Sequence, residues 1–282
     1  MAAFQTGVEL VGGRYRLDSE FTRGGQAQLY KGTDLRKGQP VILKTPLSAN
    51  DPAVRQRFQA EAAAGAAASH PALVHVLDLV ESPEMIWLVM EQADGQTLTS
   101  WVAEHGAFCF TTVLPALAQI AAGLQALHRS GLIHRDVSPT NILFDGQQAR
   151  LIDFGIALPI GSPPLTADLK VPGNPAYLAP ELALGRNAQP SADLYSLGLV
   201  LLFCLTGQAP FTADTPEDIA VAQVMGAAPT PPPGIPVGLH HLIVQMTAKD
   251  PDKRPSNIGV VGRCLADLAT ANPAHPSDCG SS

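Results

Sequence analysis

The hydrophobic pattern of this chain changes its period once, and that change restricts the fold more than any other feature. Before residue 93 the apolar residues form short, partly alternating runs that glycine and proline interrupt, as in β-strands. We predict strands at residues 15–21, 28–33, 41–44, 74–80 and 85–90. One helix is predicted at 52–69, where Asp51 is placed to cap it and Pro52 takes its first position.

From Leu98 onward the apolar residues recur at helical spacing, first around residues 114–127, and Gly131 stands where that helix would stop. Further helices are predicted at 192–206, 217–225, 237–248 and 257–270. A sheet-rich part followed by a helical part predicts an α+β fold with two lobes. We expect a small β-rich lobe with one main helix at 13–93, a larger α-helical lobe at 94–270 and a short flexible tail at 271–282.

Charge and composition restrict the classes of partner. The chain has 282 residues and a formal net charge of −7, which opposes binding to nucleic acid or to an anionic membrane surface. With 46% hydrophobic and 15% charged residues, it has the composition of a core-forming domain. The most apolar run, at 197–205, is shorter than the ~20 residues of a spanning helix and therefore predicts a buried core helix.

The cysteines and the first residues bear on the compartment. Cys109, Cys204, Cys264 and Cys279 lie far apart without a C-x-x-C pair, which argues against a zinc site and a disulfide framework. Scattered thiols suit a reducing compartment. Residues 1–10 contain neither the basic segment nor the apolar core of a secretion signal, so we expect a cytoplasmic protein.

The most specific motif lies in the helical part of the chain. His134, Arg135 and Asp136 are followed by Asn141, five residues after the aspartate, and the D-F-G sequence at 153–155 begins seventeen residues after it. Each piece alone is common in ordinary loops. The combination at this spacing is not.

Two weaker features precede this motif. The segment at 21–29 keeps only Gly24 of the three glycines in a G-x-G-x-x-G loop, and alone it favours an ordinary hairpin turn. Lys44 ends an apolar strand, where a lysine usually reaches solvent. Glu61 follows on a helix with few other carboxylates. An ion pair between Lys44 and Glu61 is therefore the functional alternative to a solvent-exposed lysine.

Together these motifs resemble the eukaryotic-like serine/threonine protein kinases of the bacterial kind, over roughly residues 13–270. The resemblance extends to 173–181, which ends in A-P-E, and to 191–198 and 249–255. It implies an enzyme that uses ATP and Mg²⁺, with Mn²⁺ as an alternative metal, to phosphorylate serine or threonine in proteins.

The resemblance also implies roles for single residues. Asp136 would orient the substrate hydroxyl, and Asn141 and Asp153 would bind the metal. Lys44 would contact the α- and β-phosphates while pairing with Glu61, and Asp136, Lys44 and Asn141 form the implied catalytic set. The implied nucleotide-binding set is Thr22, Arg23, Gly24, Gly25, Ala27, Leu29, Lys44, Glu61, Met90, Glu91 and Ala93.

Three further residues would be structural. Arg254 would pair with Glu181 of the A-P-E segment, and Asp193 would hold the backbone of the loop that contains Asp136. None of the three is expected to be catalytic.

Two positions depart from the family pattern. Ser138 stands where the family usually carries lysine, and Asn174 stands where it usually carries threonine. The resemblance places both side chains beside Asp136, and loss of the lysine would cost on the order of 10²–10³ in rate, by analogy with an oxyanion-hole donor. Lys170 and Arg23 are the candidates for a substitute cation.

Regulation and substrate preference follow from the same comparison. Thr166 is the predicted site of autophosphorylation, with a homodimer as the species in which it would occur, and Arg135 would clamp the phosphate. Thr97 and Thr140 occupy positions that are often acidic in kinases selecting arginine-rich peptides, so we predict no strong preference for basic peptides.

The sequence allows two alternatives to an active protein kinase. Ser138 and Asn174 leave open a pseudokinase, that is, a nucleotide-binding regulatory or scaffold domain with weak or no transfer. A small-molecule phosphotransferase is disfavoured by the A-P-E segment and its arginine partner. The active-kinase interpretation requires residues 44, 61, 136, 141 and 153 to converge on one nucleotide.

Overall fold

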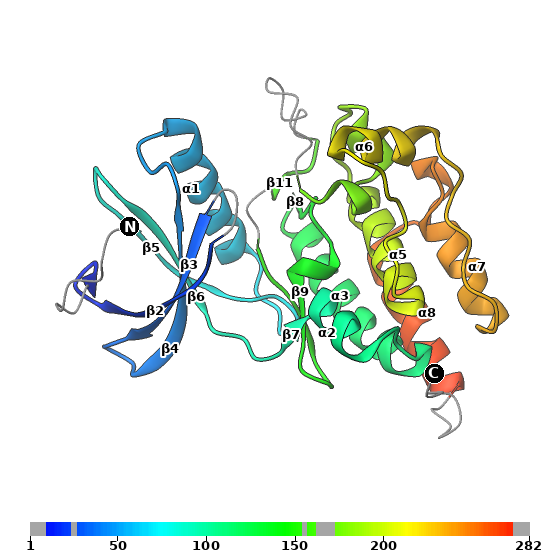
Figure 1. The fold of residues 1–282 in the computed structure, drawn as a ribbon, viewed down its shortest axis with the longest axis horizontal. Helices are drawn as coiled ribbons and strands as arrows, with labels where there is room; N and C mark the ends of the chain where they lie inside the picture. The colour runs from blue at the N-terminus through cyan, green and yellow to red at the C-terminus, as the bar shows by residue number, and fades with distance from the viewer. Residues whose placement is uncertain (1–9, 24–26, 154–156, 162–172, 273–282) are drawn as a thin grey trace. The chain divides into compact units, whose positions relative to one another are not determined.

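The structure is a computed structural model that describes residues 10–23, 27–153, 157–161 and 173–272. Its contacts divide the chain into two units (Figure 1). The first comprises residues 1–67 and 74–93, and the second comprises residues 68–73 and 94–282. The predicted order, a β-rich part followed by a helical part, is confirmed.

The first unit is an antiparallel six-stranded sheet in the order β1-β2-β3-β4-β6-β5. Its elements are β1 (Leu10–Val11), β2 (Tyr15–Arg23), β3 (Ala27–Asp34), β4 (Gln39–Pro46), α1 (Pro52–Ala67), β5 (Val76–Glu81) and β6 (Ile86–Glu91). Helix α1 packs against β5 and β6. The buried core cluster of this unit consists of Val11, Tyr15, Val41, Leu43, Trp87 and Val89.

The five predicted strands and the helix of this unit are all present. Asp51 caps α1 as predicted, because its Oδ1 accepts the Ala53 N–H at 2.9 Å. The helix ends at Ala67, two residues earlier than predicted. Strand β1 was missed because two residues are too few to show an alternating pattern.

The second unit is mainly helical. Its long helices are α2 (Leu98–His105), α3 (Phe110–Arg129), α5 (Pro190–Thr206), α6 (Pro216–Met225), α7 (Val237–Met246) and α8 (Ile258–Ala271). Helix α5 carries the apolar run at 197–205 and is buried from Ala192 to Cys204, which confirms the predicted core helix. It packs against α3, α7 and α8 (Figure 1).

Helix α3 is the one described helix long and apolar enough to cross a membrane by length and composition. Nine of its residues, from Val113 to Leu127, are buried, and the helix packs against α5 and α8. A core helix passes the same test, and this packing is what a core helix shows. Gly131, at φ +77°, follows its end as predicted.

Short strands and turns in the second unit were not predicted. The strands are β7 (Gln96–Thr97), β8 (Leu132–Ile133), β9 (Ile142–Phe144), β10 (Ala149–Leu151) and β11 (Leu158–Pro159). The short helices are η1 (Pro139–Asn141), η2 (Pro175–Tyr177), α4 (Pro180–Ala183) and η3 (Pro251–Lys253). Strands β10-β9-β7 form one small sheet and β11-β8 another. Residues 134–141 connect β8 to β9, so each end of this loop is attached to a paired strand.

Candidate active site

The loop at 134–141 connects β8 to β9, and a buried carboxylate holds its first residues. Asp193, at the start of α5, accepts the backbone N–H of His134 at 2.9 Å and that of Arg135 at 2.8 Å. Its Oδ2 also lies 2.7 Å from Nε2 of His128 on α3. Arg135 has a positive φ of 66°, which a non-glycine residue keeps only where its surroundings hold it. The predicted structural role of Asp193 is confirmed.

Asp136 is gripped at both carboxylate oxygens. Its Oδ2 accepts a hydrogen bond from Nδ2 of Asn141 at 2.8 Å, and its Oδ1 accepts one from the backbone N–H of Asn174 at 3.0 Å. Burial raises the pKa of Asp136, while the Asn174 N–H opposes this rise and the nearby charge of Asp153 adds to it. Hydrogen bonds at both oxygens fix the orientation of this carboxylate.

Asn141 uses the Nδ2 end of its side-chain amide to contact Asp136. Its Nδ2 donates to the Asp136 carbonyl at 2.9 Å as well as to the carboxylate, so Oδ1 is the ligand atom that it offers. Asp153 has a positive φ of 65°, and residues 154–156 beyond it lie outside the described residues. Its side chain is half-buried.

The oxygens of Asn141 and Asp153 suit a hard cation. Within the described residues no group of three or more His, Cys, Asp or Glu side chains is placed to hold a metal. One carboxylate and one amide oxygen match Mg²⁺, which keeps several waters and binds phosphate oxygens in place of a full protein cage. The donor set therefore fits magnesium, and zinc, which prefers sulfur and nitrogen ligands, fits poorly.

In the first unit the structure brings Lys44 and Glu61 together. Nζ of Lys44 on β4 lies 2.8 Å from Oε1 and 3.1 Å from Oε2 of Glu61 on α1. Both residues are buried, at 8% and 2% exposure, so this lysine does not reach into solvent as a strand-end lysine usually does. The Phe58 ring lies beneath the ammonium, 5.7 Å from centroid to Nζ.

The hairpin before Lys44 is formed as predicted. Strands β2 and β3 pair antiparallel, with Thr22 opposite Leu29. Ala27 is buried, whereas Thr22 is exposed and Leu29 is half-buried. Gly24 and Gly25 lie outside the described residues.

The last three residues of the implied nucleotide-binding set, Met90, Glu91 and Ala93, lie at the end of the first unit. Met90 is 7% exposed and lies opposite Ile42 of β4. The Glu91 carboxylate accepts the backbone N–H of His75 at 2.8 Å. Ala93 is half-buried and is the last residue of the unit.

The two departures from the family pattern have distinct surroundings. Ser138 is fully buried, and its hydroxyl lies 2.9 Å from that of Thr140. The Asn174 side chain caps η2 by accepting the Ala176 N–H at 3.2 Å. Residue 174 therefore contacts Asp136 through its backbone N–H, whereas a side-chain contact was expected. A backbone contact cannot be predicted from residue type, because nearly every residue has the same N–H group.

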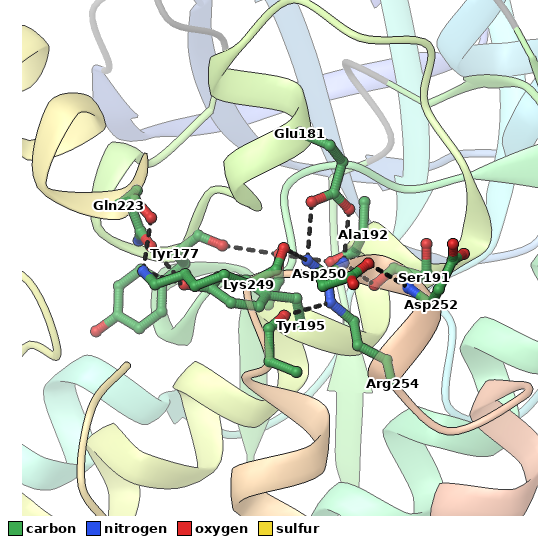
Figure 2. Close-up of polar contacts among 12 residues, drawn as sticks. Tyr177, Glu181, Ser191, Ala192, Tyr195, Gln223, Lys249, Asp250, Asp252 and Arg254 are labelled. Atoms are coloured by element: carbon green, nitrogen blue, oxygen red, sulfur yellow. Dashed lines mark hydrogen bonds and ion pairs between the residues drawn. The ribbon is translucent and has the colours of Figure 1, made fainter. Parts of the chain in front are cut away.

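The predicted ion pair between Glu181 and Arg254 is confirmed. The guanidinium makes two parallel hydrogen bonds to the carboxylate, at 2.6 and 2.8 Å, and both residues are buried. Arg254 also donates to the Ser191 carbonyl at 2.8 Å (Figure 2).

A polar cluster next to this pair was missed at the sequence level. It consists of Gln223 from α6, Tyr195 from α5 and Lys249 from the segment after α7 (Figure 2). Gln223 joins it to η2 through the Ala176 carbonyl. The Tyr195 hydroxyl donates to Gln223 Oε1 at 2.7 Å, and Lys249 donates to the Gln223 carbonyl at 2.6 Å. Glutamine is a residue type that is mostly exposed, so no local signal marks this one as buried.

Several predicted positions cannot be placed. Thr166 and Lys170 lie outside the described residues, and nothing is described of the Arg23 side chain.

Comparison with known proteins identifies relatives of this chain. The family model described as the protein kinase domain matches residues 15–266. The serine/threonine-protein kinase PknA of Mycobacterium tuberculosis is 36% identical over 282 residues, covering 97% of this chain and 65% of that protein. PknL of the same species, also named a serine/threonine-protein kinase, is 35% identical over 266 residues, covering 92% and 67%.

A relative from another organism gives a similar result. The probable serine/threonine-protein kinase PknB of Lactococcus lactis is 33% identical over 265 residues, covering 92% of this chain and 42% of that protein. The chain thus spans less than two thirds of the length of PknA and less than half that of this PknB.

Proposed function

Because this chain belongs to the protein kinase family, in its bacterial-type serine/threonine branch, we propose that it transfers the γ-phosphoryl group of ATP to serine or threonine hydroxyls of proteins. The observation that carries the proposal is the double hold on Asp136. Asn141 and the Asn174 backbone fix both carboxylate oxygens, as a residue that must orient a reacting hydroxyl requires.

Asp136 orients the acceptor hydroxyl and takes its proton as the oxygen attacks phosphorus. Asn141 and Asp153 would hold Mg²⁺, with Mn²⁺ as an alternative. When bound, the metal neutralises charge on the transferred phosphoryl group.

Lys44 supplies positive charge to the α- and β-phosphates, and Glu61 keeps its ammonium in one position. The proposed nucleotide-binding residues are those of the hairpin and of the end of the first unit: Thr22, Arg23, Gly24, Gly25, Ala27, Leu29, Met90, Glu91 and Ala93. Met90 is proposed as the gatekeeper residue, and backbone groups of residues 91–93 are proposed to meet the adenine.

Ser138 leaves the transfer step without the usual lysine next to Asp136. Lys170 and Arg23 are the proposed substitutes. If either supplies the missing charge, its change to alanine lowers the turnover rate; full activity in both alanine variants rejects this idea.

Protein acceptors are proposed without a strong preference for basic peptides. Thr97 uses its hydroxyl to cap α2, accepting the Ser100 N–H at 3.1 Å, and Thr140 bonds to Ser138. Neither residue offers a carboxylate to an arginine of a substrate. Marked selection of arginine on a peptide array would contradict this.

Autophosphorylation at Thr166, within a transient homodimer, belongs to the same proposal. Phosphopeptide mapping after incubation with ATP checks it, and an unmodified Thr166 in an active sample refutes it.

We also propose a cytoplasmic location, because Cys109, Cys204 and Cys264 are free thiols.

One assay tests the main proposal. Purified protein, radiolabelled ATP and Mg²⁺ should label the chain or a generic protein acceptor, and Asp136→Asn should abolish labelling while ATP still binds. Nucleotide binding without transfer in the unsubstituted protein would support the pseudokinase alternative. Transfer to small hydroxyl compounds but not to proteins would support a small-molecule phosphotransferase.

A further inference from the structure

Gln223 is the most completely enclosed polar side chain of α6, with no exposed surface. A buried amide is costly unless all its hydrogen-bonding groups are satisfied. Nε2 of Gln223 donates to the Ala176 carbonyl at 2.8 Å and to the Pro175 carbonyl at 3.3 Å. Its Oε1 accepts the Tyr195 hydroxyl at 2.7 Å. Both ends of the amide are thus used, and the side chain has one position.

The other contacts of Gln223 fix the helix that carries it. Lys249 donates to the Gln223 carbonyl at 2.6 Å and to the Tyr195 hydroxyl at 3.2 Å. The Lys249 ammonium also lies 4.4 Å from the centroid of the Phe211 ring. The side-chain amide of Gln223 is consequently held from α5, while its backbone is held from the segment after α7 (Figure 2).

The two carbonyls that Gln223 holds belong to η2, directly after Asn174. The Asn174 backbone N–H is the group that donates to Asp136 Oδ1 at 3.0 Å. The Asn174 side chain caps the same turn, because its Oδ1 accepts the Ala176 N–H at 3.2 Å. The position of the N–H therefore depends on the backbone of this turn. Gln223 ties the turn to the helical core at the Pro175 and Ala176 carbonyls, while Ser196 of α5 bonds only the last carbonyl of the turn, that of Tyr177, at 2.7 Å.

We propose that Gln223 is a positioning residue for phosphoryl transfer, which holds the Pro175–Ala176 turn so that the Asn174 N–H stays on Asp136. The proposal rests on the proposed function, in which Asp136 orients the acceptor hydroxyl. A displacement of about 1 Å in a reacting group can cost on the order of 10² in rate, so a loose turn reduces turnover without touching the nucleotide.

Two variants separate positioning from general packing. Gln223→Met keeps the length and volume of the side chain but removes both donors to the turn. Tyr195→Phe removes the same Gln223–Tyr195 hydrogen bond and leaves both donors in place. We expect Gln223→Met to lower kcat by roughly tenfold or more with the KM for ATP within about twofold of the parent, and Tyr195→Phe to keep kcat within about twofold.

A spectroscopic readout tests the link itself. In ¹H–¹⁵N spectra of the full chain, the Asn174 amide proton should move upfield in Gln223→Met, as its hydrogen bond to a carboxylate weakens, and stay in place in Tyr195→Phe. If Gln223→Met fails to fold, the double variant Tyr195→Phe/Gln223→Met removes both polar groups of the pair and takes its place.

The outcomes are distinct. An unchanged kcat in the folded methionine variant, an unmoved Asn174 amide, or an equal loss in Tyr195→Phe each overturns the proposal. If the parent protein transfers no phosphate, the proposed function fails, whereas the Asn174 amide still decides whether Gln223 positions the turn.

Discussion

Arg254 shows how much one buried side chain can organise. It is 6% exposed, and besides its two bonds to Glu181 it donates to the carbonyls of Ser191, Ala248 and Lys249. The guanidinium also lies over the Tyr195 ring, 4.8 Å from its centroid. A planar group with five donors suits this task, and lysine does not.

Arg254→Met is therefore expected to be strongly destabilising. It leaves the Glu181 carboxylate buried without its counter-charge, which typically costs about 3–5 kcal/mol. Urea unfolding measures the loss, and the double variant Glu181→Gln/Arg254→Met should lose less because no charge remains buried. A loss below about 1 kcal/mol would place this pair among ion pairs of surface strength.

Lys249 predicts a pH dependence of stability. Burial, and then the charge of Arg254, lower the pKa of Lys249 to about 8. Between that value and the ordinary lysine pKa of about 10.5 the unfolded chain binds more protons, so the Lys249 contribution to the free energy of unfolding rises with pH. Below pH 8 its contribution stays constant.

Lys249→Met removes that contribution. In denaturant titrations, the free energy of unfolding of the parent minus that of this variant should therefore increase from pH 8 to pH 9.5. The comparison stays below pH 10, the ordinary pKa of tyrosine. Burial raises the pKa of Tyr15, Tyr177 and Tyr195, so these residues lower the free energy of unfolding once tyrosines of the unfolded chain ionise. A difference that is flat or shrinks with pH contradicts a lowered Lys249 pKa.

Among the elements, α5 and the segment that ends α7 approach unusually closely. A Cβ added at Gly198 of α5 would meet Met246 Cβ at 2.9 Å and Thr247 Cγ2 at 3.0 Å. Neither atom is the far end of a flexible side chain. A glycine at this position therefore sets the distance between α5 and α7.

Gly198→Ala should destabilise the protein by about 1–3 kcal/mol, because overpacking outweighs the gain of up to about 1 kcal/mol from alanine in a helix. Gly238→Ala in α7 is the matched control, since its Cβ would meet only the flexible Leu268 Cδ2, at 3.2 Å. It should be neutral or slightly stabilising in the same thermal and urea unfolding experiments. If both variants behave alike, close packing at Gly198 is not the cause.

The short strands matter more for the site than their length suggests. Strand β8 pairs with β11 just before His134, and β9 pairs with β10 and β7 just after Asn141. The loop that holds Asp136 is thereby fixed at both ends, and the hydrogen bonds from Asp193 fix its start a second time.

At the scale of the whole molecule, ligand binding should raise the free energy of unfolding. If Mg²⁺ and ATP bind the folded chain as proposed, a ligand concentration of 100 times Kd adds about 2.7 kcal/mol to the free energy of unfolding. Asp153→Asn should remove most of the additional stabilisation that Mg²⁺ gives over ATP alone, as measured by differential scanning calorimetry with EDTA as the metal-free reference. A shift that is equal with and without Mg²⁺ contradicts the metal role of Asp153.

The sequence by itself determined which long elements are strands and which are helices, and which residues pair in the Glu181–Arg254 ion pair. Periods of two and of 3.6 residues are local properties, so the strands of the first unit and helices such as α5 and α8 could be predicted within a few residues. The family resemblance carried by the motifs was enough to predict the pairing of Arg254 with Glu181, which lie 73 residues apart, and the hydrogen bonds of Asp193 to the 134–141 loop.

Only the tertiary structure decided how Asp136 is held. The Asn174 contact uses a backbone N–H, which every residue except proline possesses, so no residue type can announce it. Gln223 became an anchor only because α6 packs against η2, and strands of two or three residues are too short for a period. Chemistry that depends on side-chain type is readable from the chain, whereas chemistry that depends on where the backbone passes requires the fold.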